Sequence, residues 1–236
     1  MDIPVWLDQN DCRFPDSRLA LRQPNGLLAV GGSLDPDTLL KAYHQGIFPW
    51  YSDDQPLLWW SPDPRAVLFP EQLHVSRSLR RTIHSGRFTV TADQAFERVI
   101  RACATPRSAR DEAGTWITAA MRDAYNRLHQ LGYAHSIEVW QADALAGGLY
   151  GLALGRVFFG ESMFHHQRDA SKVALVYLVQ HLQIQGFRLI DCQQATSHLE
   201  SLGATTIPRN QFNELLQRYS YDERFKPNWR LSATQS

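Results

Sequence analysis

The chain has 236 residues, of which 44% are hydrophobic and 20% charged, a composition that suits a globular protein of one or two domains. Its longest apolar run, near residue 173, is far shorter than the roughly 18 residues that a membrane-spanning helix needs. Because the N-terminus does not resemble a signal peptide either, we expect a soluble, cytoplasmic protein without membrane association. Three widely spaced cysteines without a CxxC pair predict neither a disulfide framework nor a cysteine zinc site.

The net charge of zero, from 24 basic and 24 acidic residues, hides a strong asymmetry along the chain. Residues 1–64 carry four basic residues against nine aspartates, a net charge of −5. Residues 65–110 carry nine arginines against three acids, a net charge of +6. Opposed charges in different regions indicate more about partners than their total does. A polyanionic partner is therefore not excluded.

Residues 1–62 are rich in turn-forming residues and predict a small N-terminal α+β lobe. One helix is well signalled, with Asp35 as its N-cap, Pro36 in its first turn and Gly46 as its terminator. Two aromatic and proline-dense stretches follow at 47–51 and 57–69, where the prolines favour extended and turn conformations.

Residues 63–236 show longer and more regular patterns, which predict the larger domain and a C-terminal tail. Helices are expected over 76–85, 93–104, 118–131, 170–185, 197–202 and 209–219. Strands are expected over 87–91, 135–141, 145–154, 156–164, 187–192 and 204–207, with the second to fourth of these forming an antiparallel meander. The fold class is therefore α+β with a central sheet, and the tail after residue 219 is expected to be loosely held.

Two strand segments carry polar residues in apolar surroundings. In GESMF (160–164), strand alternation predicts that Glu161 and Met163 face the same side. Glu161 taken alone is more often an exposed strand carboxylate than a site residue. In LIDCQ (189–193), Asp191 and Gln193 end an apolar strand and either belong to a site or cap a helix near residue 196.

Loop aromatics and clustered arginines suggest a nucleic-acid ligand. Trp50 and Trp116 lie in connecting segments, where they either stack on a flat ligand or pack between domains. One face of a predicted helix and the turn after it carry four arginines with few acidic residues nearby, namely Arg77, Arg80, Arg81 and Arg87. They form either a solvated charged surface or a surface that binds the phosphates of a nucleic acid.

Several kinds of chemistry find no support in the sequence. It contains no GxxxxGK[ST], GxSxG or HExxH motif and no GxGxxG that opens a helix. The adjacent His165 and His166 would point to opposite faces of a strand, and no third ligand has suitable spacing. We therefore expect neither a metal nor a cofactor.

Many short motifs in a fixed order resemble the leucyl/phenylalanyl-tRNA-protein transferase family. They are FPWY (48–51), WWSPDPRAV (59–67), TWIT (115–118), HSIEVW (135–140), GGLYG (147–151), GESMF (160–164), ASK (170–172), LIDCQ (189–193) and HLESLGA (198–204). The resemblance implies a small N-terminal lobe and a catalytic domain similar to the GCN5-related N-acyltransferase fold. The turn HHQRDA (165–170) lacks the glycine-rich loop that cradles coenzyme A, which disfavours an acyl-CoA donor.

The resemblance also implies an activity. Such an enzyme moves leucine or phenylalanine, and less well methionine, from aminoacyl-tRNA to the α-amino group of proteins that begin with Arg or Lys. The product is an N-degron, and neither DNA nor a membrane takes part. The rival readings are a cell-wall peptide transferase that also uses charged tRNA, and a non-catalytic RNA-binding module.

Site roles follow from the same resemblance. Asp191 would orient the acceptor amine, Gln193 would hydrogen-bond the reacting centre and Glu161 would position the ester or the acceptor. Trp50 and Trp116 would stack around the terminal adenosine. An apolar donor pocket and a tRNA-binding segment are implied at two further groups of residues: Phe158, Met163 and Leu149 for the pocket, and Arg77, Arg80, Arg81 and Arg87 for tRNA.

Two points stay open at the level of sequence. The group that finally takes the proton is Gln193, Asp191, a water molecule or the 2′-hydroxyl of the tRNA. The cationic side chain of the acceptor needs an acidic partner, for which Asp53 and Asp54 of the acidic lobe are candidates.

Overall fold

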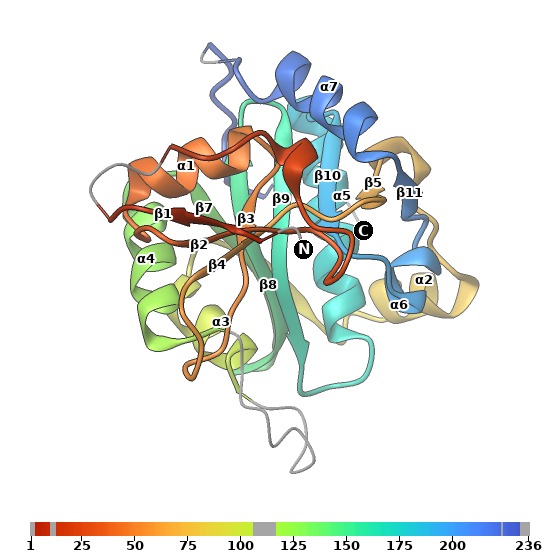
Figure 1. Cartoon of the computed structure of the whole chain (residues 1–236). Coiled ribbons are helices and arrows are strands. Elements are labelled where there is room, and N and C mark those ends of the chain that lie inside the picture. The colour runs from red at the N-terminus through yellow and green to blue at the C-terminus, as the bar shows by residue number, and fades with distance from the viewer. Residues whose placement is uncertain (1–2, 10–12, 106–116, 223, 232–236) are drawn as a thin grey trace.

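The computed structural model describes residues 3–9, 13–105, 117–222 and 224–231, which form two β-sheets with helices around them (Figure 1). A four-stranded sheet has the order β1-β2-β4-β3, and a seven-stranded sheet has the order β11-β5-β10-β9-β8-β7-β6. The fold is mixed α+β with a central sheet and a small N-terminal part, as expected from the sequence.

The N-terminal part contains the smaller sheet and one helix. Its elements are β1 (Val5–Leu7), a 3₁₀ turn (Ser17–Leu19), β2 (Leu27–Gly31), α1 (Pro36–His44), β3 (Phe48–Pro49) and β4 (Leu58–Trp60). β1 runs parallel to β2, whereas the other pairs are antiparallel. The division of the chain at residues 62 and 63 stays a prediction, because one hydrophobic cluster includes residues from both parts.

The larger sheet begins with β5 (Arg65–Leu68) and contains the expected meander. Its other strands are β6 (Thr89–Ala92), β7 (Ala134–Gln141), β8 (Ala144–Leu154), β9 (Val157–His165), β10 (Leu189–Gln193) and β11 (Thr205–Ile207). The helices after β5 are a 3₁₀ turn (Pro70–Gln72), α2 (Arg77–His84), α3 (Phe96–Cys103), α4 (Ala119–Gln130), α5 (Ala170–Gln185), α6 (Ser197–Glu200) and α7 (Arg209–Tyr219). β7, β8 and β9 pair antiparallel, and β10 runs parallel to β9 after the crossover through α5.

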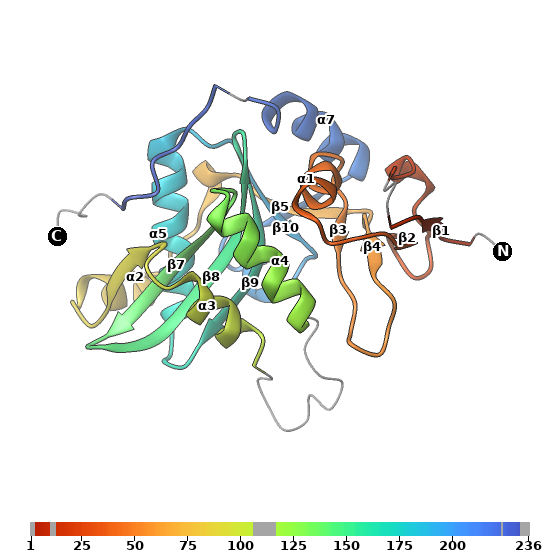
Figure 2. The same ribbon diagram turned by 90° about the vertical axis from the view of Figure 1, so that its left-hand side faces the viewer.

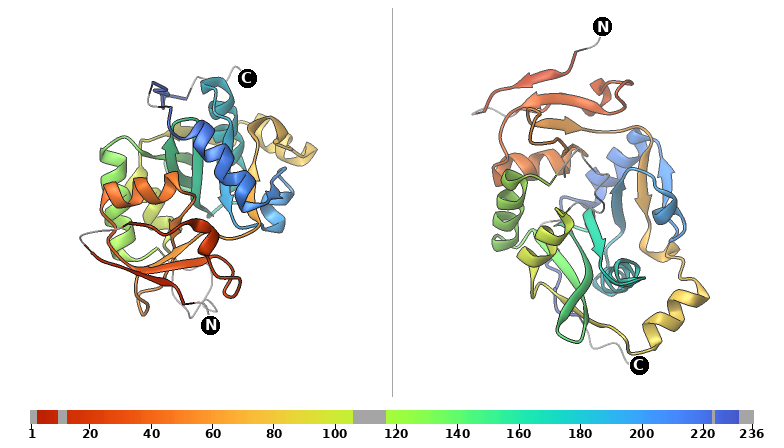
Figure 3. Two further views of the ribbon diagram at one scale, coloured as in Figure 1. Left: turned by 45° about the horizontal axis from the view of Figure 1, so that its top comes forward. Right: turned by 90° about the horizontal axis from the view of Figure 1, so that it is seen from below.

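Helices cover both faces of the larger sheet (Figures 2 and 3). One hydrophobic cluster joins α1, α3 and α4 to one face, and a second joins α5 and the single buried residue of α2, Leu79, to the other. α5 is apolar around most of its circumference, which suits a helix packed between the sheet and other elements. It ends at Gly186, whose φ of +86° is the left-handed conformation that glycine adopts without strain.

An irregularity in strand β9 shapes the interior. Tyr150 pairs with Ser162 and Gly151 pairs with Gly160, so Glu161 is an extra residue in β9 without a partner on β8. Such a bulge interrupts the alternation of a strand. The expectation that Glu161 and Met163 face the same side is therefore wrong: Met163 packs into the cluster under α5, whereas the Glu161 carboxylate contacts tyrosines from α1 and α4.

The C-terminal tail is also unlike the expectation. Instead of being loosely held, residues 224–231 place three apolar side chains against the cluster under α5: Phe225, Trp229 and Leu231. Asp222 accepts a hydrogen bond from Arg156 Nε at 2.9 Å, which adds an ion pair where the tail begins. The aromatic residues of the tail indicate in the sequence that it packs against the domain, because large aromatic side chains are rarely left in water when an apolar surface is available.

Candidate active site

A cavity of about 510 Å³ lies between β8, β9, β10 and α5. Its wall contains seven large apolar side chains, namely Leu149, Phe158, Met163, Leu175, Leu178, Ile190 and Leu199. Glu161 and Gln193 belong to the same wall. A concave apolar surface with a few converging polar groups is the usual form of a small-ligand site.

Glu161 is buried, with only 8% of its surface exposed, and its carboxylate accepts three hydrogen bonds. Its Oε1 accepts from the Tyr43 hydroxyl at 2.8 Å and from Gln193 Nε2 at 3.0 Å. Its Oε2 accepts from the Tyr125 hydroxyl at 2.8 Å. Burial disfavours the charged form and raises the pKa of Glu161 from 4.5 to about 7, although the two tyrosine hydrogen bonds oppose that shift.

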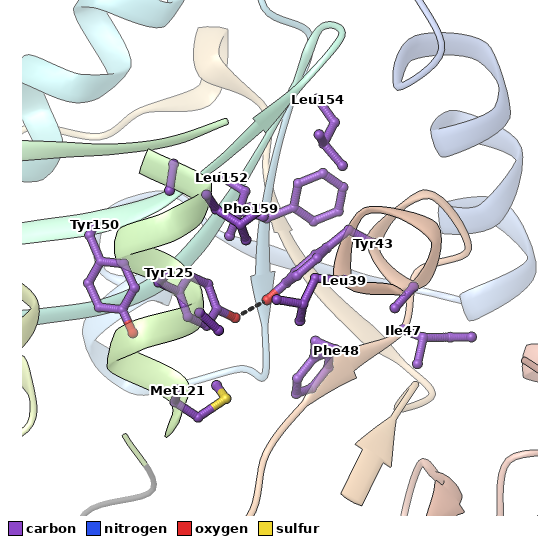
Figure 4. Packing of buried hydrophobic residues seen from close by; sticks show 14 of the residues in the cluster. Leu39, Tyr43, Ile47, Phe48, Met121, Tyr125, Tyr150, Leu152, Leu154 and Phe159 are labelled. Carbon is purple, nitrogen blue, oxygen red and sulfur yellow. Dashed lines mark hydrogen bonds between the residues drawn. The ribbon is translucent and has the colours of Figure 1, made fainter. Parts of the chain in front are cut away.

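Tyr43 and Tyr125 come from different parts of the chain and meet at Glu161. Figure 4 shows Tyr43 reaching from α1 toward Tyr125 on α4, with a hydrogen bond between the two hydroxyl groups. Both rings are fully buried, and burial together with the nearby Glu161 carboxylate raises the pKa of each phenol well above its ordinary value. They therefore remain protonated near neutral pH. With one proton each, the two phenols supply two of the three hydrogen bonds that join them and Glu161, and the third is complete when the carboxyl group is protonated.

Asp191 forms a buried ion pair with Arg65 and does not line the cavity. Arg65 Nε and Nη2 donate to the two carboxylate oxygens at 2.8 and 2.7 Å, and both side chains have no exposed surface. Arg65 Nη1 donates to the carbonyl of Gly46 at 3.0 Å, and its guanidinium lies over the rings of Phe48 and Phe212. The bidentate geometry and the additional partners are what a buried pair requires to persist.

Gln193 connects this ion pair to Glu161. Its backbone N–H donates to Asp191 Oδ1 at 2.9 Å, while its side-chain amide donates to Glu161. Its φ of +61° is left-handed, a conformation that non-glycine residues rarely adopt, and it sits where the pairing of β10 with β5 shifts register. Strained backbone of this kind clusters at functional sites, where the surroundings enforce it. The alternative role as a helix cap is wrong, because Thr196 caps α6 by accepting from Leu199 N–H.

The structure brings together five of the twelve site residues singled out from the sequence. Phe158, Met163 and Leu149 line the cavity beside Glu161 and Gln193. Trp50 is 38% exposed, packs edge-on against Trp60 and does not line this cavity. Trp116 lies outside the described residues.

The predicted tRNA-binding arginines are all exposed. Arg77, Arg80 and Arg81 lie on α2, where spacings of three and four residues place them on one face. None of the three forms an ion pair with an acidic residue in the described ranges. Arg87 follows α2 and donates to Gln167 Oε1 at 3.0 Å.

Three residues of the site were missed from the sequence: Tyr43, Tyr125 and Arg65. Arg65 had a signal, because it opens the apolar run RAVLF, and a cation in a buried strand needs a carboxylate partner. Nothing in the sequence singled out the two tyrosines, because an aromatic residue on the apolar face of an amphipathic helix is ordinary. Among the described residues, no group of three His, Cys, Asp or Glu side chains could hold a metal ion, and no helix has the length and apolar character that crossing a membrane requires.

Solved structures give weak overall similarity. One is described as the structure of L-PGS from Bacillus licheniformis, with a TM-score of 0.41, 12% identity, and coverage of 89% of this chain and 69% of the other. Another is a GCN5-related N-acetyltransferase from Kribbella flavida, with a TM-score of 0.37 and 10% identity. The match covers 74% of this chain and 61% of the other.

The apolar cavity, with a buried carboxylate and an amide in its wall, has the form of a site for a small ligand with an apolar part. Two family models identify the chain further: the leucyl/phenylalanyl-tRNA protein transferase matches residues 67–217, and its N-terminal domain matches residues 32–63. A leucyl/phenylalanyl-tRNA–protein transferase of Stutzerimonas stutzeri is 59% identical over 96% of this chain and 99% of its own length. A leucyl/phenylalanyl-tRNA–protein transferase of Pseudomonas aeruginosa PAO1 is 58% identical over 91% of this chain and 94% of its own length. The chain belongs to the leucyl/phenylalanyl-tRNA protein transferase family and is an aminoacyltransferase.

Proposed function

We propose that this aminoacyltransferase moves leucine or phenylalanine, and less well methionine, from charged tRNA to the α-amino group of cytoplasmic proteins that begin with Arg or Lys. The product would carry an N-degron and be directed to degradation. The observation that supports this function best is the cavity of about 510 Å³, whose apolar wall adjoins the Glu161 and Gln193 pair.

The reaction is aminolysis of an ester. The amine nitrogen of the acceptor attacks the carbonyl carbon of the aminoacyl ester, a tetrahedral oxyanion forms, and the bond to the ribose oxygen breaks as the peptide bond forms. The attacking amine loses a proton and the leaving ribose oxygen gains one. Because an ester is already activated, positioning, proton handling and stabilisation of the oxyanion suffice.

The apolar wall holds the donor side chain. Leu149, Phe158 and Met163 offer a surface that matches leucine and phenylalanine in chemistry and size. Methionine is flexible, so Met163 allows the wall to fit both a branched and an aromatic side chain. Such a pocket discriminates by shape, at about 1–3 kcal/mol per methylene, and therefore disfavours smaller aliphatic donors without rejecting them absolutely.

Glu161 is suited to handle the proton of the acceptor. An α-amino group has a pKa of about 7.7–8.0, so much of the acceptor is protonated at neutral pH. With its pKa near 7, Glu161 is ionised in a large fraction of molecules at the same pH and can stabilise or accept the proton. Its Oε2 accepts only one hydrogen bond, from Tyr125, among the described residues, which leaves room for a second donor.

Gln193 presents its amide to the reacting centre, and Asp191 acts through Gln193 rather than by touching the amine. Asp191 holds the backbone N–H of Gln193, and Arg65 holds Asp191. This chain of contacts enforces the left-handed backbone that aims the Gln193 side chain at Glu161. In this proposal Asp191 and Arg65 position the site, and Gln193 and Glu161 contact the reacting groups.

The exposed arginines of α2 hold the tRNA through its phosphates. Contacts to phosphates fix the orientation of the nucleic acid without reading its sequence, which suits an enzyme that accepts more than one tRNA. Trp50 and Trp116 are proposed to stack around the terminal adenosine. Asp53 and Asp54, both exposed between β3 and β4, are proposed to attract the cationic acceptor.

Single-turnover mixing of labelled leucyl-tRNA with three peptides tests this function. The peptides begin with Arg, Lys or Ala and are otherwise identical. We expect label on the Arg and Lys peptides alone. Equal label on the Ala peptide would contradict the proposed acceptor, and tRNA binding without label on any peptide would contradict transfer to proteins.

A further inference from the structure

The C-terminal tail places an aromatic ring behind the wall of the cavity. Trp229 does not line the cavity, but its ring centroid lies 5.9 Å from that of Phe158, which does. Both belong to the hydrophobic cluster under α5. Phe158 thus has the cavity on one side and the tail on another.

The chain leaves Phe158 little room to move. Its ring is fully buried, and it packs so closely on Gly151 that a Cβ atom at that position would lie 2.6 Å from Phe158 Cε1. Real Cβ contacts are not that short, so only glycine permits this position of the ring. With Gly151 and Trp229 both against the ring, the position of Phe158 depends on both neighbours.

Trp229 is itself held in a fixed place. Its ring stacks on His135 with centroids 3.8 Å apart and an angle of 9° between planes, and the centroid of His181 lies 5.3 Å away. His135 is fixed in turn, because its Nδ1 lies 2.8 Å from Asp93 Oδ2 and its Nε2 lies 3.1 Å from the carbonyl of Gly132. The tail therefore offers a rigid support.

We propose that Trp229 is a positioning residue that sets the depth of the donor cavity through Phe158. It thereby sets the preference of the enzyme between leucine and the larger phenylalanine. This inference rests on the proposed function, in which the cavity holds the donor side chain. It assigns to the tail a part in donor choice, although the tail does not touch the donor.

The direction of the effect follows from packing. Replacing Trp229 by alanine opens space behind Phe158, and side chains next to a cavity relax part of the way into it. A retreat of the Phe158 ring enlarges the donor cavity. A larger cavity favours phenylalanine, which fills it, over leucine, which then leaves part of it empty.

The experiment compares kcat/KM for phenylalanyl-tRNA and leucyl-tRNA with one Arg peptide, in wild type, Trp229→Ala, Trp229→Leu and a control. The control is Phe225→Ala, because Phe225 belongs to the same tail but packs on Phe187 and Arg156. We expect Trp229→Ala to raise the phenylalanine-to-leucine ratio about fivefold, a modest effect for a pocket that discriminates by shape. Trp229→Leu should raise it less, and Phe225→Ala should leave it unchanged.

The ratio is insensitive to a loss of folded enzyme, since both donors are measured on one preparation. An unchanged ratio in both Trp229 variants would overturn the inference, and so would an equal rise in Phe225→Ala, which would mean that detachment of the tail is the cause. If Trp229→Ala does not fold, the ratio for Trp229→Leu decides in the same way. Failure of the proposed function looks different, because wild type would then transfer neither donor.

Discussion

Replacing Asp191 by asparagine tests the chain of contacts from Arg65 to Gln193. Asparagine keeps the shape but loses the charge and presents an amide donor toward a guanidinium that needs an acceptor. Breaking a fully buried ion pair from one side costs about 3–5 kcal/mol. Since asparagine retains one acceptor oxygen, we expect the lower end of this range, a fall of about 3 kcal/mol in the free energy of unfolding. The whole stability of a typical protein is about 5–15 kcal/mol, so the variant should still fold.

The same substitution should also lower the rate of transfer. The hydrogen bond from Gln193 N–H to Asp191 holds a left-handed residue, a conformation that costs about 1–3 kcal/mol when it is not enforced. When the asparagine turns its oxygen to Arg65 Nη2, its NH2 group takes the place of the oxygen that accepts from Gln193 N–H, and this hydrogen bond is lost. The Gln193 amide then no longer points at Glu161. Loss of one preorganised donor in a transition state lowers the rate by about 10²-fold or more. We expect a fall of that size in single-turnover transfer, with tRNA binding unchanged.

A double variant separates positioning from stability. Arg65→Met with Asp191→Leu replaces the buried pair by apolar side chains of similar size, which is often neutral or stabilising. Urea unfolding should therefore show stability near that of wild type. Transfer should stay about 10²-fold down, because Gln193 N–H has lost its acceptor. A double variant that is stable and transfers at the rate of wild type would refute the positioning role.

Three further variants test other parts of the same site. In wild type the rate of transfer should rise with pH through an inflection near pH 7, as the Glu161 carboxyl group ionises, and through a second inflection at about 7.7–8.0, as the acceptor amine loses its proton. Glu161→Gln should remove the first inflection and keep the second. An unchanged pH profile would contradict the role of Glu161. Because native wild type keeps the Glu161 proton up to a higher pH than the unfolded chain does, its free energy of unfolding should fall as the pH rises from 4.5 to about 7. Urea unfolding of Glu161→Gln should not show this fall. Joint replacement of Arg77, Arg80 and Arg81 by alanine should reduce the slope of log affinity against log salt for tRNA by about 2 to 3 and spare transfer from a short aminoacyl-adenosine ester, whereas equal loss with both donors would speak against phosphate contacts. Leu149→Phe should narrow the cavity and lower kcat/KM for phenylalanyl-tRNA more than for leucyl-tRNA, by about tenfold, and an unchanged ratio would place the donor side chain elsewhere.

Local patterns were enough to predict most elements of the fold. The helices expected over 76–85 and 118–131 are present, and Ser76 and Thr118 cap them by accepting a hydrogen bond from the backbone N–H three positions later. Gly186 ended α5 as expected. These features depend on neighbours within a few residues, and short-range steric and hydrogen-bonding rules decide them.

The details of the site depended on contacts between distant segments. The bulge that turns Glu161 toward the tyrosines arises from the pairing of β9 with β8, which strand periodicity cannot show. The partnership of Arg65 with Asp191 joins residues 126 positions apart. The motifs indicated candidate residues, whereas their proposed division into positioning and contacting groups rests on the tertiary structure.

Opposed charges along the sequence now have distinct places. Arg77, Arg80 and Arg81 present three exposed guanidinium groups on α2, whereas Asp53 and Asp54 are exposed between β3 and β4 of the N-terminal part. Charges of opposite sign on separate surfaces suit an enzyme that brings a polyanion and a cationic peptide together.

A crystal structure with a non-hydrolysable amide analogue of phenylalanyl-adenosine will show whether the cavity between β8, β9, β10 and α5 is the donor site. We expect the benzyl group to lie against Leu149, Phe158 and Met163, with the carbonyl carbon within reach of Glu161 and Gln193. A benzyl group bound outside this cavity, with Glu161 still enclosed by Tyr43 and Tyr125, would contradict this expectation.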